Sequence, residues 1–282
     1  KKFEAWAAPV ECDDVKELEA TWSDLTLLSF VKDMAVDGIK SKHKARLVVA
    51  GDKVKPIGQR LGGMTKFFDQ ELWAPVTSLE GCRGVIQHAL QSGNELRSID
   101  VTSAYLQVKW KGKPHFLRMP KDVVECMSSD ERRRHYGMRE PVYEMKRAIY
   151  GHQESGKLFI EEFMEHMVKN GWIQMECDRA VLKRGDEMAC TYVDDVLTSI
   201  GRSEIVEDEI RERFLIGKFE KCVSFLGMSI RRCGDYADIS NEAYIDAIAE
   251  GYKEAFGYEC KQAWSPLTMQ PSGGEKSDPK RE

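Results

Sequence analysis

The sequence predicts an α+β fold in which a layer of antiparallel strands is backed by helices. Short apolar runs typical of strands and longer runs with helical spacing are mixed irregularly along the chain. The regular strand–helix–strand alternation of a parallel sheet is missing, and we find no internal repeat. The 282 residues, 42% hydrophobic and 32% charged, suffice for one large globular domain or two ordinary ones.

Four segments have the apolar spacing of amphipathic helices. In the clearest of them, Phe159, Phe163 and Met167 recur every four residues, and Asn170-Gly171 ends the pattern. We expect helices at 78–93, 155–171, 203–214 and 240–256.

The strands are expected to be short and bounded by turn residues. Their apolar centres lie in "RLVVAG", "LRSIDVTSAYLQV", "HFLRMP", "ACTYVDDVLTSI" and "SFLGMSI", whereas the first 40 residues have little clear period. The charged segment 121–140 is expected to be a surface insertion. We expect the Gly-rich segment 58–68 to be mobile and the tail 269–282 to be disordered.

Charge and cysteine content limit the classes of protein to which the chain can belong. The net charge of -5 gives no overall attraction to nucleic acid, so such binding would depend on local basic clusters such as 40–55. The eight cysteines have neither CxxC pairs nor zinc-like spacing, which favours reduced thiols in an intracellular protein. No apolar run has the length of a membrane span, and the first residues lack a signal-peptide pattern.

Two adjacent acids, Asp194 and Asp195, interrupt a run that otherwise has strand character. Because strands disfavour Asp while tight turns tolerate it, we expect the pair to form the two-residue loop of a β-hairpin. One interpretation is a solvated turn. The other is a divalent-metal site, which Asp100 supports: it is the one acid within an apolar strand pattern, and a buried acid is costly unless paired or metal-bound. Adjacent strands could bring all three acids together for two-metal phosphoryl transfer.

Eight short motifs occur in an order that is typical of one family. They are "KARLVVAG", "WAPVTSLEGCRGVIQHAL", "IDVTSAYLQ", "HFLRMP", "MKRAIYGHQESGKLF", "YVDD", "FLGMSI" and "ISNEAYI". In this order they resemble the reverse transcriptase domain of Ty1/copia-type retrotransposon polyproteins. The resemblance implies a right-hand fold with an antiparallel palm sheet backed by helices, fingers, and a short or partial thumb.

The same resemblance implies how the chain is divided. The expected segments are a lead-in to the fingers at 1–40, fingers and palm at 41–230 with the palm centred on 78–107 and 154–230, the start of a thumb or connection at 231–268, and the tail 269–282.

For the active site, the resemblance implies that Asp100, Asp194 and Asp195 are the catalytic carboxylates. They would bind two Mg²⁺ ions, which Mn²⁺ could replace, and the backbone of Val101 would lie beside the metals and the triphosphate. The metals would activate the primer 3′-hydroxyl and offset charge on the leaving pyrophosphate.

Further residues match the family's nucleotide site. Tyr105 matches the aromatic steric gate that excludes a ribose 2′-hydroxyl, although a core tyrosine is an alternative interpretation. Arg46 matches the arginine that holds the incoming triphosphate, a bidentate task that suits a guanidinium. Lys44 either assists it or is an ordinary surface lysine.

Beyond the hairpin, the resemblance implies a turn that grips the primer at Phe225, Leu226 and Gly227. The alternative for Phe225 and Leu226 is a place in the core. Lys218 lies near the family's basic residue that protonates pyrophosphate, so it is a candidate general acid.

One segment departs from the family pattern. Where the family reads approximately "ALYGLKQAPRAW", this chain reads "AIYGHQESGKLF", so the family's glutamine falls on Glu154, with Gln153 one position earlier. An acid there would repel a triphosphate unless it were protonated or metal-bound. Either Gln153 takes the role through a shifted turn, or the site works differently, or activity is impaired. His152 in the same turn is interpreted as structural.

The first functional hypothesis is therefore an RNA-directed DNA polymerase that uses Mg²⁺, deoxynucleoside triphosphates, an RNA template and a primer. It would be part of a larger Gag-Pol-like polyprotein in cytoplasmic virus-like particles and in the nucleus, without membrane contact. The second is a catalytically impaired remnant of a mobile element that keeps the fold and weak nucleic-acid binding. A different two-metal phosphotransferase has no motif support beyond the acids themselves.

Overall fold

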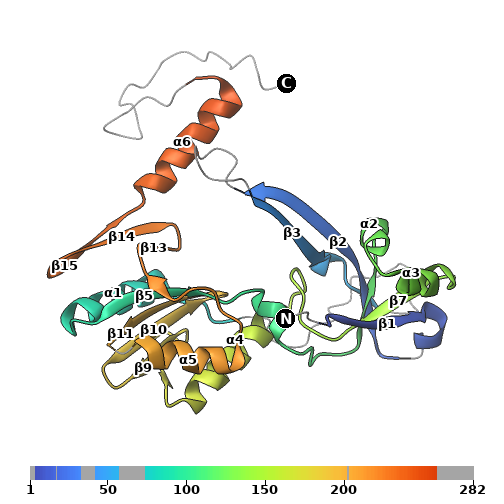
Figure 1. The fold of residues 1–282 in the computed structure, drawn as a ribbon, viewed down its shortest axis with the longest axis horizontal. Coiled ribbons are helices and arrows are strands. Elements are labelled where there is room, and N and C mark those ends of the chain that lie inside the picture. Colours follow the sequence, from blue (N-terminus) through green and yellow to red (C-terminus); the bar gives the residue numbers. More distant parts are fainter. Residues whose placement is uncertain (1–3, 17, 33–41, 57–73, 202, 259–282) are drawn as a thin grey trace, which may run out of the picture. The chain divides into compact units, whose positions relative to one another are not determined.

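The structure, a computed structural model, describes residues 4–16, 18–32, 42–56, 74–201 and 203–258. The chain divides into two compact units (Figure 1). One consists of Lys1–Cys222 with Arg232–Ala237, and the other of Val223–Arg231 with Asp238–Glu282. The segment 58–68 and the tail 269–282, which we expected to be mobile or disordered, lie outside the described residues.

The first sheet of the larger unit has six strands, in the order β1-β7-β6-β2-β3 with β4 paired to β2. They are β1 (Trp6–Glu11), β2 (Thr21–Lys32), β3 (Lys42–Val49), β4 (Lys55–Pro56), β6 (His115–Arg118) and β7 (Pro141–Met145). β2 and β6 run parallel, so the expectation of purely antiparallel strands is wrong at this one pairing. The other pairings of this sheet are antiparallel.

The first 40 residues contain β1 and the long strand β2, which the sequence pattern did not reveal. Adjacent apolar pairs such as Leu27-Leu28 break the alternation along β2. Its partners instead come from distant parts of the chain: Thr21 pairs with His115 of β6, and Leu28 pairs with Arg46 of β3. Pairing between distant segments therefore determines this strand.

The segment 121–140 folds into two short helices, α2 (Lys121–Glu125) and α3 (Ser129–Tyr136). None of the side chains of α3 is buried, as expected for a surface insertion, whereas α2 buries Val123 and Val124. Ser128 caps α3 by a reciprocal capping box with Glu131, which explains where this helix begins.

The second sheet of the larger unit is antiparallel throughout and carries the predicted hairpin. Its order is β12-β5-β11-β10-β9-β8. The strands are β5 (Glu95–Asp100), β8 (Ile173–Gln174), β9 (Val181–Arg184), β10 (Glu187–Tyr192), β11 (Asp195–Ile200) and β12 (Glu220–Lys221).

Three predicted helices are confirmed around this sheet: α1 (Leu79–Gln91), α4 (Ser155–Lys169) and α5 (Ser203–Arg213). Ser78 caps α1 by accepting a hydrogen bond from the amide of Gly81 at 2.9 Å. Neighbouring strand residues point to opposite faces, and on β10 Ala189 joins the core beneath α4 and α5 while Cys190 contacts Cys82 of α1. The sheet therefore lies between α1 and the α4–α5 pair (Figure 1).

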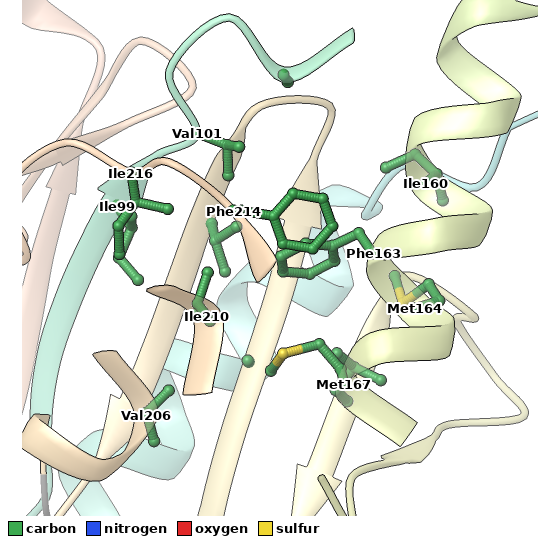
Figure 2. Packing of buried hydrophobic residues seen from close by; sticks show 14 of the residues in the cluster. Ile99, Val101, Ile160, Phe163, Met164, Met167, Val206, Ile210, Phe214 and Ile216 are labelled. Atoms are coloured by element: carbon green, nitrogen blue, oxygen red, sulfur yellow. The ribbon is translucent and has the colours of Figure 1, made fainter. Parts of the chain in front are cut away.

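The core between the sheet and helices α4 and α5 holds the end of the sheet that carries Asp100 in place. Figure 2 shows Phe163 and Met167 of α4 and Ile210 of α5 packed towards the strands. Burying a large apolar side chain contributes about 1.5–3 kcal/mol relative to leaving it exposed. Because Ile99 and Val101 belong to the same cluster, this packing anchors both neighbours of Asp100.

The smaller unit contains most of a three-stranded sheet and the last described helix. The strands are β13 (Ser224–Phe225), β14 (Met228–Cys233) and β15 (Tyr236–Ser240), followed by α6 (Glu242–Phe256). "FLGMSI" is therefore two strands and a turn rather than the single strand expected. The physical reason is that Leu226 and Gly227 both have positive φ, which closes a tight hairpin. The expected helix over 240–256 is confirmed as α6, although none of its side chains is buried.

Candidate active site

The hairpin formed by β10 and β11 carries two of the predicted acids, but its turn lies one residue earlier than expected. Tyr192 pairs with Asp195, so the two-residue loop is Val193-Asp194 and Asp195 is the first residue of β11. Val193 has a φ of 58°, a conformation that is a genuine outlier for a β-branched residue. The turn thus stores backbone strain, which is typical of functional sites.

Asp100 is the last residue of β5 and lies directly opposite Asp195 in the antiparallel pairing. Residues opposite each other in such a pair project from the same face with Cβ atoms roughly 4.5–5.5 Å apart. The expectation that Asp100 is a buried acid is wrong: its side chain is exposed, because the strand ends there. The carboxylates of Asp100 and Asp195 therefore come together at the solvent-facing end of the sheet.

Two backbone hydrogen bonds fix this end of β5. The amide of Val101 donates to the carbonyl of Asp194 at 2.8 Å, which ties the turn to the strand. The amide of Gly217 donates to the carbonyl of Asp100, also at 2.8 Å. The Val101 amide is thus engaged with the hairpin, and Asp194 is held beside the pair Asp100 and Asp195.

Two tyrosines and an arginine form a cluster that faces the acids. The rings of Tyr105 and Tyr150 are 4.6 Å apart between centroids, and the Arg46 guanidinium lies 5.5 Å from the centroid of Tyr150. Burial raises the pKa of Tyr150 to about 12, with the charge of Asp194 adding to the shift and Arg46 opposing it. Burial and then Asp194 also raise the pKa of Tyr105 above its usual value. The charge of Asp194 thus acts on both tyrosines, and Arg46 lies against the ring of Tyr150.

Tyr150 was not among the residues predicted for the site. It lies in the quoted motif "MKRAIYGHQESGKLF", so the motif indicated the segment but not the residue. No spacing rule links it to Arg46 or Asp194, which are far away in the sequence. Only the folded chain brings the three together.

The turn after Tyr150 directs Gln153 and Glu154 to different places. The side-chain amide of Gln153 donates to the carbonyl of Gly51 at 2.8 Å, so it links this turn to the segment that follows β3. The carboxylate of Glu154 lies over the loop at Gly112, where an added Cβ would be 2.6 Å from one of its oxygens. Burial raises the pKa of Glu154, and nearby Lys157 opposes that shift.

His152 in the same turn is buried and has structural partners, which agrees with its interpretation. Its ring meets those of Trp110 and His115 edge-on at 4.5 and 4.6 Å between centroids. Burial lowers its pKa to about 4, so it is neutral at pH 7.

The other predicted residues have simpler surroundings. Lys44 is exposed two residues before Arg46 on β3, and alternation places both side chains on one face. Lys218 follows Gly217 and forms an exposed ion pair with Glu220 at 3.6 Å. Phe225, Leu226 and Gly227 form the tight hairpin of the smaller unit, in which Phe225 is buried and Leu226 is exposed; their role at a primer stays a prediction.

The donor chemistry of the carboxylates suits a hard divalent cation. Within the part of the chain that the structure describes, no three His, Cys, Asp or Glu side chains are arranged so that they could hold a metal ion. Mg²⁺, however, takes one or two carboxylates and completes its shell with water and substrate phosphates. Asp100 and Asp195, opposite each other on neighbouring strands, are the pair that could hold it, and Asp194 lies at the adjoining turn.

Comparisons with known proteins identify the family of the chain. A family model described as "Reverse transcriptase (RNA-dependent DNA polymerase)" matches residues 12–263, so the chain belongs to the reverse transcriptase family. Its relatives identify the Ty1/copia type within that family, which confirms the resemblance drawn from the motifs.

Three of these relatives show how far the similarity extends. The chain is 26% identical to the retrovirus-related Pol polyprotein from transposon RE2 of Arabidopsis thaliana and 25% identical to that from transposon RE1. Both matches cover 89% of this chain and 16% of the relative. The truncated transposon Ty1-A Gag-Pol polyprotein of Saccharomyces cerevisiae is 26% identical over 55% of this chain and 11% of its own length. The chain thus spans a small part of the relatives it matches.

Among the described helices, none is both long and apolar enough to cross a membrane. The seven described cysteines, a set that leaves out Cys260, form no disulfide with one another.

Proposed function

We propose that the chain is an RNA-directed DNA polymerase of a Ty1/copia-like retrotransposon, which adds deoxynucleotides to a primer 3′-hydroxyl. The observation that carries the proposal is the register of β5 and β11, which sets Asp100 directly opposite Asp195 with Asp194 at the adjoining turn. A solvated turn alone would need no acid on the neighbouring strand. Family membership supports the same reaction class.

In this proposal Asp100, Asp194 and Asp195 would hold two Mg²⁺ ions, whose shells substrate phosphates and water would complete. Bound Mg²⁺ would lower the pKa of the primer hydroxyl and offset the charge of the leaving pyrophosphate. The carboxylates orient the reacting groups, because their strands are anchored by the core and by the Val101–Asp194 hydrogen bond. Lys218, next to the segment that contacts Asp100, is the proposed donor of a proton to pyrophosphate.

The incoming nucleotide is proposed to enter beside the cluster of Arg46, Tyr150 and Tyr105. Arg46, assisted by Lys44, supplies positive charge for the triphosphate from β3. Tyr105 presents a half-buried ring whose hydroxyl lies near Gly156 of α4, where an added Cβ would be 3.6 Å away. A fixed ring in that position could exclude a 2′-hydroxyl.

The remaining assignments follow the same proposal. The first sheet and its helices would serve as fingers, the second sheet with α1, α4 and α5 as the palm, and the smaller unit as the start of a thumb. Within that smaller unit Phe225, Leu226 and Gly227 would contact the primer. The proposed setting is a Gag-Pol-like polyprotein acting on an RNA template inside a cell, in virus-like particles.

The competing remnant hypothesis rests on Glu154. Its carboxylate lies over Gly112, beside the loop that carries Trp110, and Gln153 makes the turn's contact with Gly51. The Glu154 carboxylate thus has a position of its own at Gly112, and the activity of Glu154→Gln tests whether this acid impairs the reaction.

Primer extension on poly(rA)/oligo(dT) with Mg²⁺ or Mn²⁺ tests the proposal. We expect the wild-type chain to extend the primer and Asp194→Asn to lose roughly 10²–10³-fold in rate, the scale of losing one strong electrostatic contact in a transition state. Asp186→Asn, an exposed aspartate in the β9–β10 turn, is the matched control and should keep full activity. If wild type and Asp194→Asn extend equally little while both bind primer–template, the remnant hypothesis holds instead.

Tyr105 has its own test, because its two interpretations differ in sugar selectivity. Tyr105→Ala should raise incorporation of ribonucleotides relative to deoxynucleotides, since the ring that blocks the 2′-hydroxyl is gone. A core tyrosine would lower stability and leave the selectivity ratio unchanged. The ratio of kcat/KM for the two sugars decides between them.

A further inference from the structure

The side chain of Gln107 is buried and fully hydrogen-bonded to backbone groups of two different segments. It is the last residue of a 3-10 helix, η3 (Ala104–Gln107), and is 4% exposed. Its amide nitrogen donates to the carbonyls of Thr102 at 2.7 Å and Leu215 at 2.8 Å, and its amide oxygen accepts from the amide of Leu215 at 2.6 Å. A single side chain thus joins Thr102, just after β5, to Leu215, which lies 108 residues beyond Gln107.

The segment that Gln107 holds is the one that supports Asp100. The amide of Gly217 donates to the carbonyl of Asp100 at 2.8 Å, and an added Cβ on Gly217 would be 3.4 Å from that carbonyl oxygen. Ile216 and Val101 form an isolated antiparallel bridge, and Figure 2 shows their side chains beside each other. Residues 215–217 therefore hold the backbone at Asp100 and at the residues directly after it.

The carbonyl of Gln107 adds a second connection to its surroundings. It accepts from Arg147 at 3.0 Å and from Arg213 at 3.2 Å. Arg213 also pairs with Glu162 of α4, whose other carboxylate oxygen is 3.6 Å from the ammonium of Lys111. Because these contacts come from several elements, Gln107 has little freedom to relax if its side chain is changed.

We infer that Gln107 is a positioning residue that sets Asp100 against the hairpin acids by holding residues 215–217 on the end of β5. A glutamine suits this task, because only an amide both donates to two carbonyls and accepts from an N–H at neutral pH. The catalytic part of the inference rests on the polymerase function proposed above. The structural part does not.

The matched control is Asn94, a second buried amide at the opposite end of the same strand. It is 7% exposed, immediately precedes β5, and donates to the carbonyl of Asp186 at 2.7 Å. Asn94→Leu should therefore cost stability as Gln107→Leu does, through one lost backbone hydrogen bond, but far from Asp100.

The first measurement is hydrogen exchange of the Val101 and Gly217 amides, the two that bond to Asp194 and Asp100. In Gln107→Leu we expect both to exchange at least about tenfold faster, since losing buried hydrogen bonds worth about 1.4 kcal/mol opens the segment by that factor. In Asn94→Leu they should keep the wild-type rates. Unchanged exchange in Gln107→Leu, or equal acceleration in both variants, would overturn the inference.

The second measurement is primer extension as a function of Mg²⁺ concentration. Gln107→Leu should lower kcat by roughly 10²-fold, the cost of a displacement of about 1 Å in a reacting group, and raise the Mg²⁺ concentration for half-maximal rate. KM for deoxynucleotide should change little, and Asn94→Leu should have the wild-type Mg²⁺ dependence. Equal Mg²⁺ dependence in all three proteins would mean that Gln107 stabilises the fold without positioning Asp100.

The two measurements separate this inference from the proposed function. If the wild-type chain does not extend a primer, the polymerase proposal fails, while the exchange rates still decide whether Gln107 holds Asp100 in place. If Gln107→Leu does not fold, Gln107→Asn replaces it. The shorter amide reaches fewer of the three partners, so the Val101 and Gly217 amides should exchange faster than in the wild type, and wild-type rates would overturn the inference.

Discussion

The two turns that border the candidate active site are held in different ways. The hairpin turn at Val193-Asp194 closes a local ladder in which Thr191 pairs with Val196 and Tyr192 with Asp195. The turn at 150–154 is instead held by partners about a hundred residues earlier in the chain, through backbone and side-chain contacts with 49–51. Substitutions in the first turn should therefore alter the chemistry of the site, whereas those in the second should detach β3, the strand that carries Arg46.

Gly151 is the place where the second turn is most easily broken, and it gives the largest expected effect. It has a φ of 90°, and an added Cβ would lie 2.1 Å from the carbonyl oxygen of Val49. Gly151→Ala should lower the free energy of unfolding by about 3 kcal/mol, since backbone strain and a steric clash act together. Urea unfolding measures this loss.

Gly185 provides the matched control for that variant. It also has positive φ, at 55°, but an added Cβ would meet nothing within 4 Å. Gly185→Ala should therefore cost only about 1–2 kcal/mol, from strain alone. Equal losses in the two variants would show that the close approach of the Gly151 turn to β3 is unimportant.

The same turn should also weaken in acid, because neutral histidines support it. Burial lowers the pKa of His152 from 6.5 to about 4 and that of His115 to about 3, with His152 adding to the shift of His115. The unfolded chain then binds more protons than the folded one below pH 6.5. Stability is thus complete above about pH 6.5 and falls by up to about 1.4 kcal/mol per pH unit for each histidine as the pH drops towards 4.

Unfolding of His152→Gln at several pH values isolates the contribution of His152 to the pH dependence of stability. Its free energy of unfolding should fall less steeply than that of the wild type between pH 6.5 and 4, by the slope of one histidine. His43→Gln, at an exposed position of β3, should have the wild-type slope. Parallel curves for the wild type and His152→Gln would contradict burial of a neutral ring.

The contrast between the two turns also explains what could be predicted from the sequence. The hairpin acids were found because a strand has period two and disfavours Asp, so Asp194 and Asp195 are anomalous within their own twelve residues. The turn was nevertheless misplaced by one residue, because a valine with positive φ contradicts local propensity. Tyr150 and the contact between Gln153 and Gly51 depend on pairing of distant segments, for which a single sequence contains no signal. The long strand β2 was missed for the same reason.

Backbone strain at Val193 can be tested by substitution in the hairpin turn. Asparagine tolerates the left-handed conformation that Val193 adopts, whereas a β-branched residue is strained there by about 1–2 kcal/mol. Val193→Asn should raise the free energy of unfolding by about 1 kcal/mol. Val196→Asn, at a buried position of β11 with extended backbone, should lower it. Destabilisation by both variants would mean that the turn is not strained by its valine.

Glu154 should give the smallest effect, although it is the most conspicuous departure from the family pattern. Burial raises its pKa above the ordinary value, so at neutral pH the ionised carboxylate costs stability, and this cost disappears as the pH falls below about 4.5. The effect is small, since solvent screens a half-exposed group and Lys157 opposes the shift. Glu154→Gln should therefore raise the free energy of unfolding slightly at pH 7 and not at all below its normal titration range.

The activity of Glu154→Gln decides whether the acid has a role of its own. Its carboxylate lies over Gly112, away from the partners that Gln153 uses, so primer extension should be unchanged or faster. Glu161→Gln is the matched control, since Glu161 is exposed and also pairs with Lys157, at 3.8 Å. If extension collapses in Glu154→Gln and persists in Glu161→Gln, the acid contributes to the reaction directly. The turn at 150–154 then takes part in the reaction and does not only hold β3 in place.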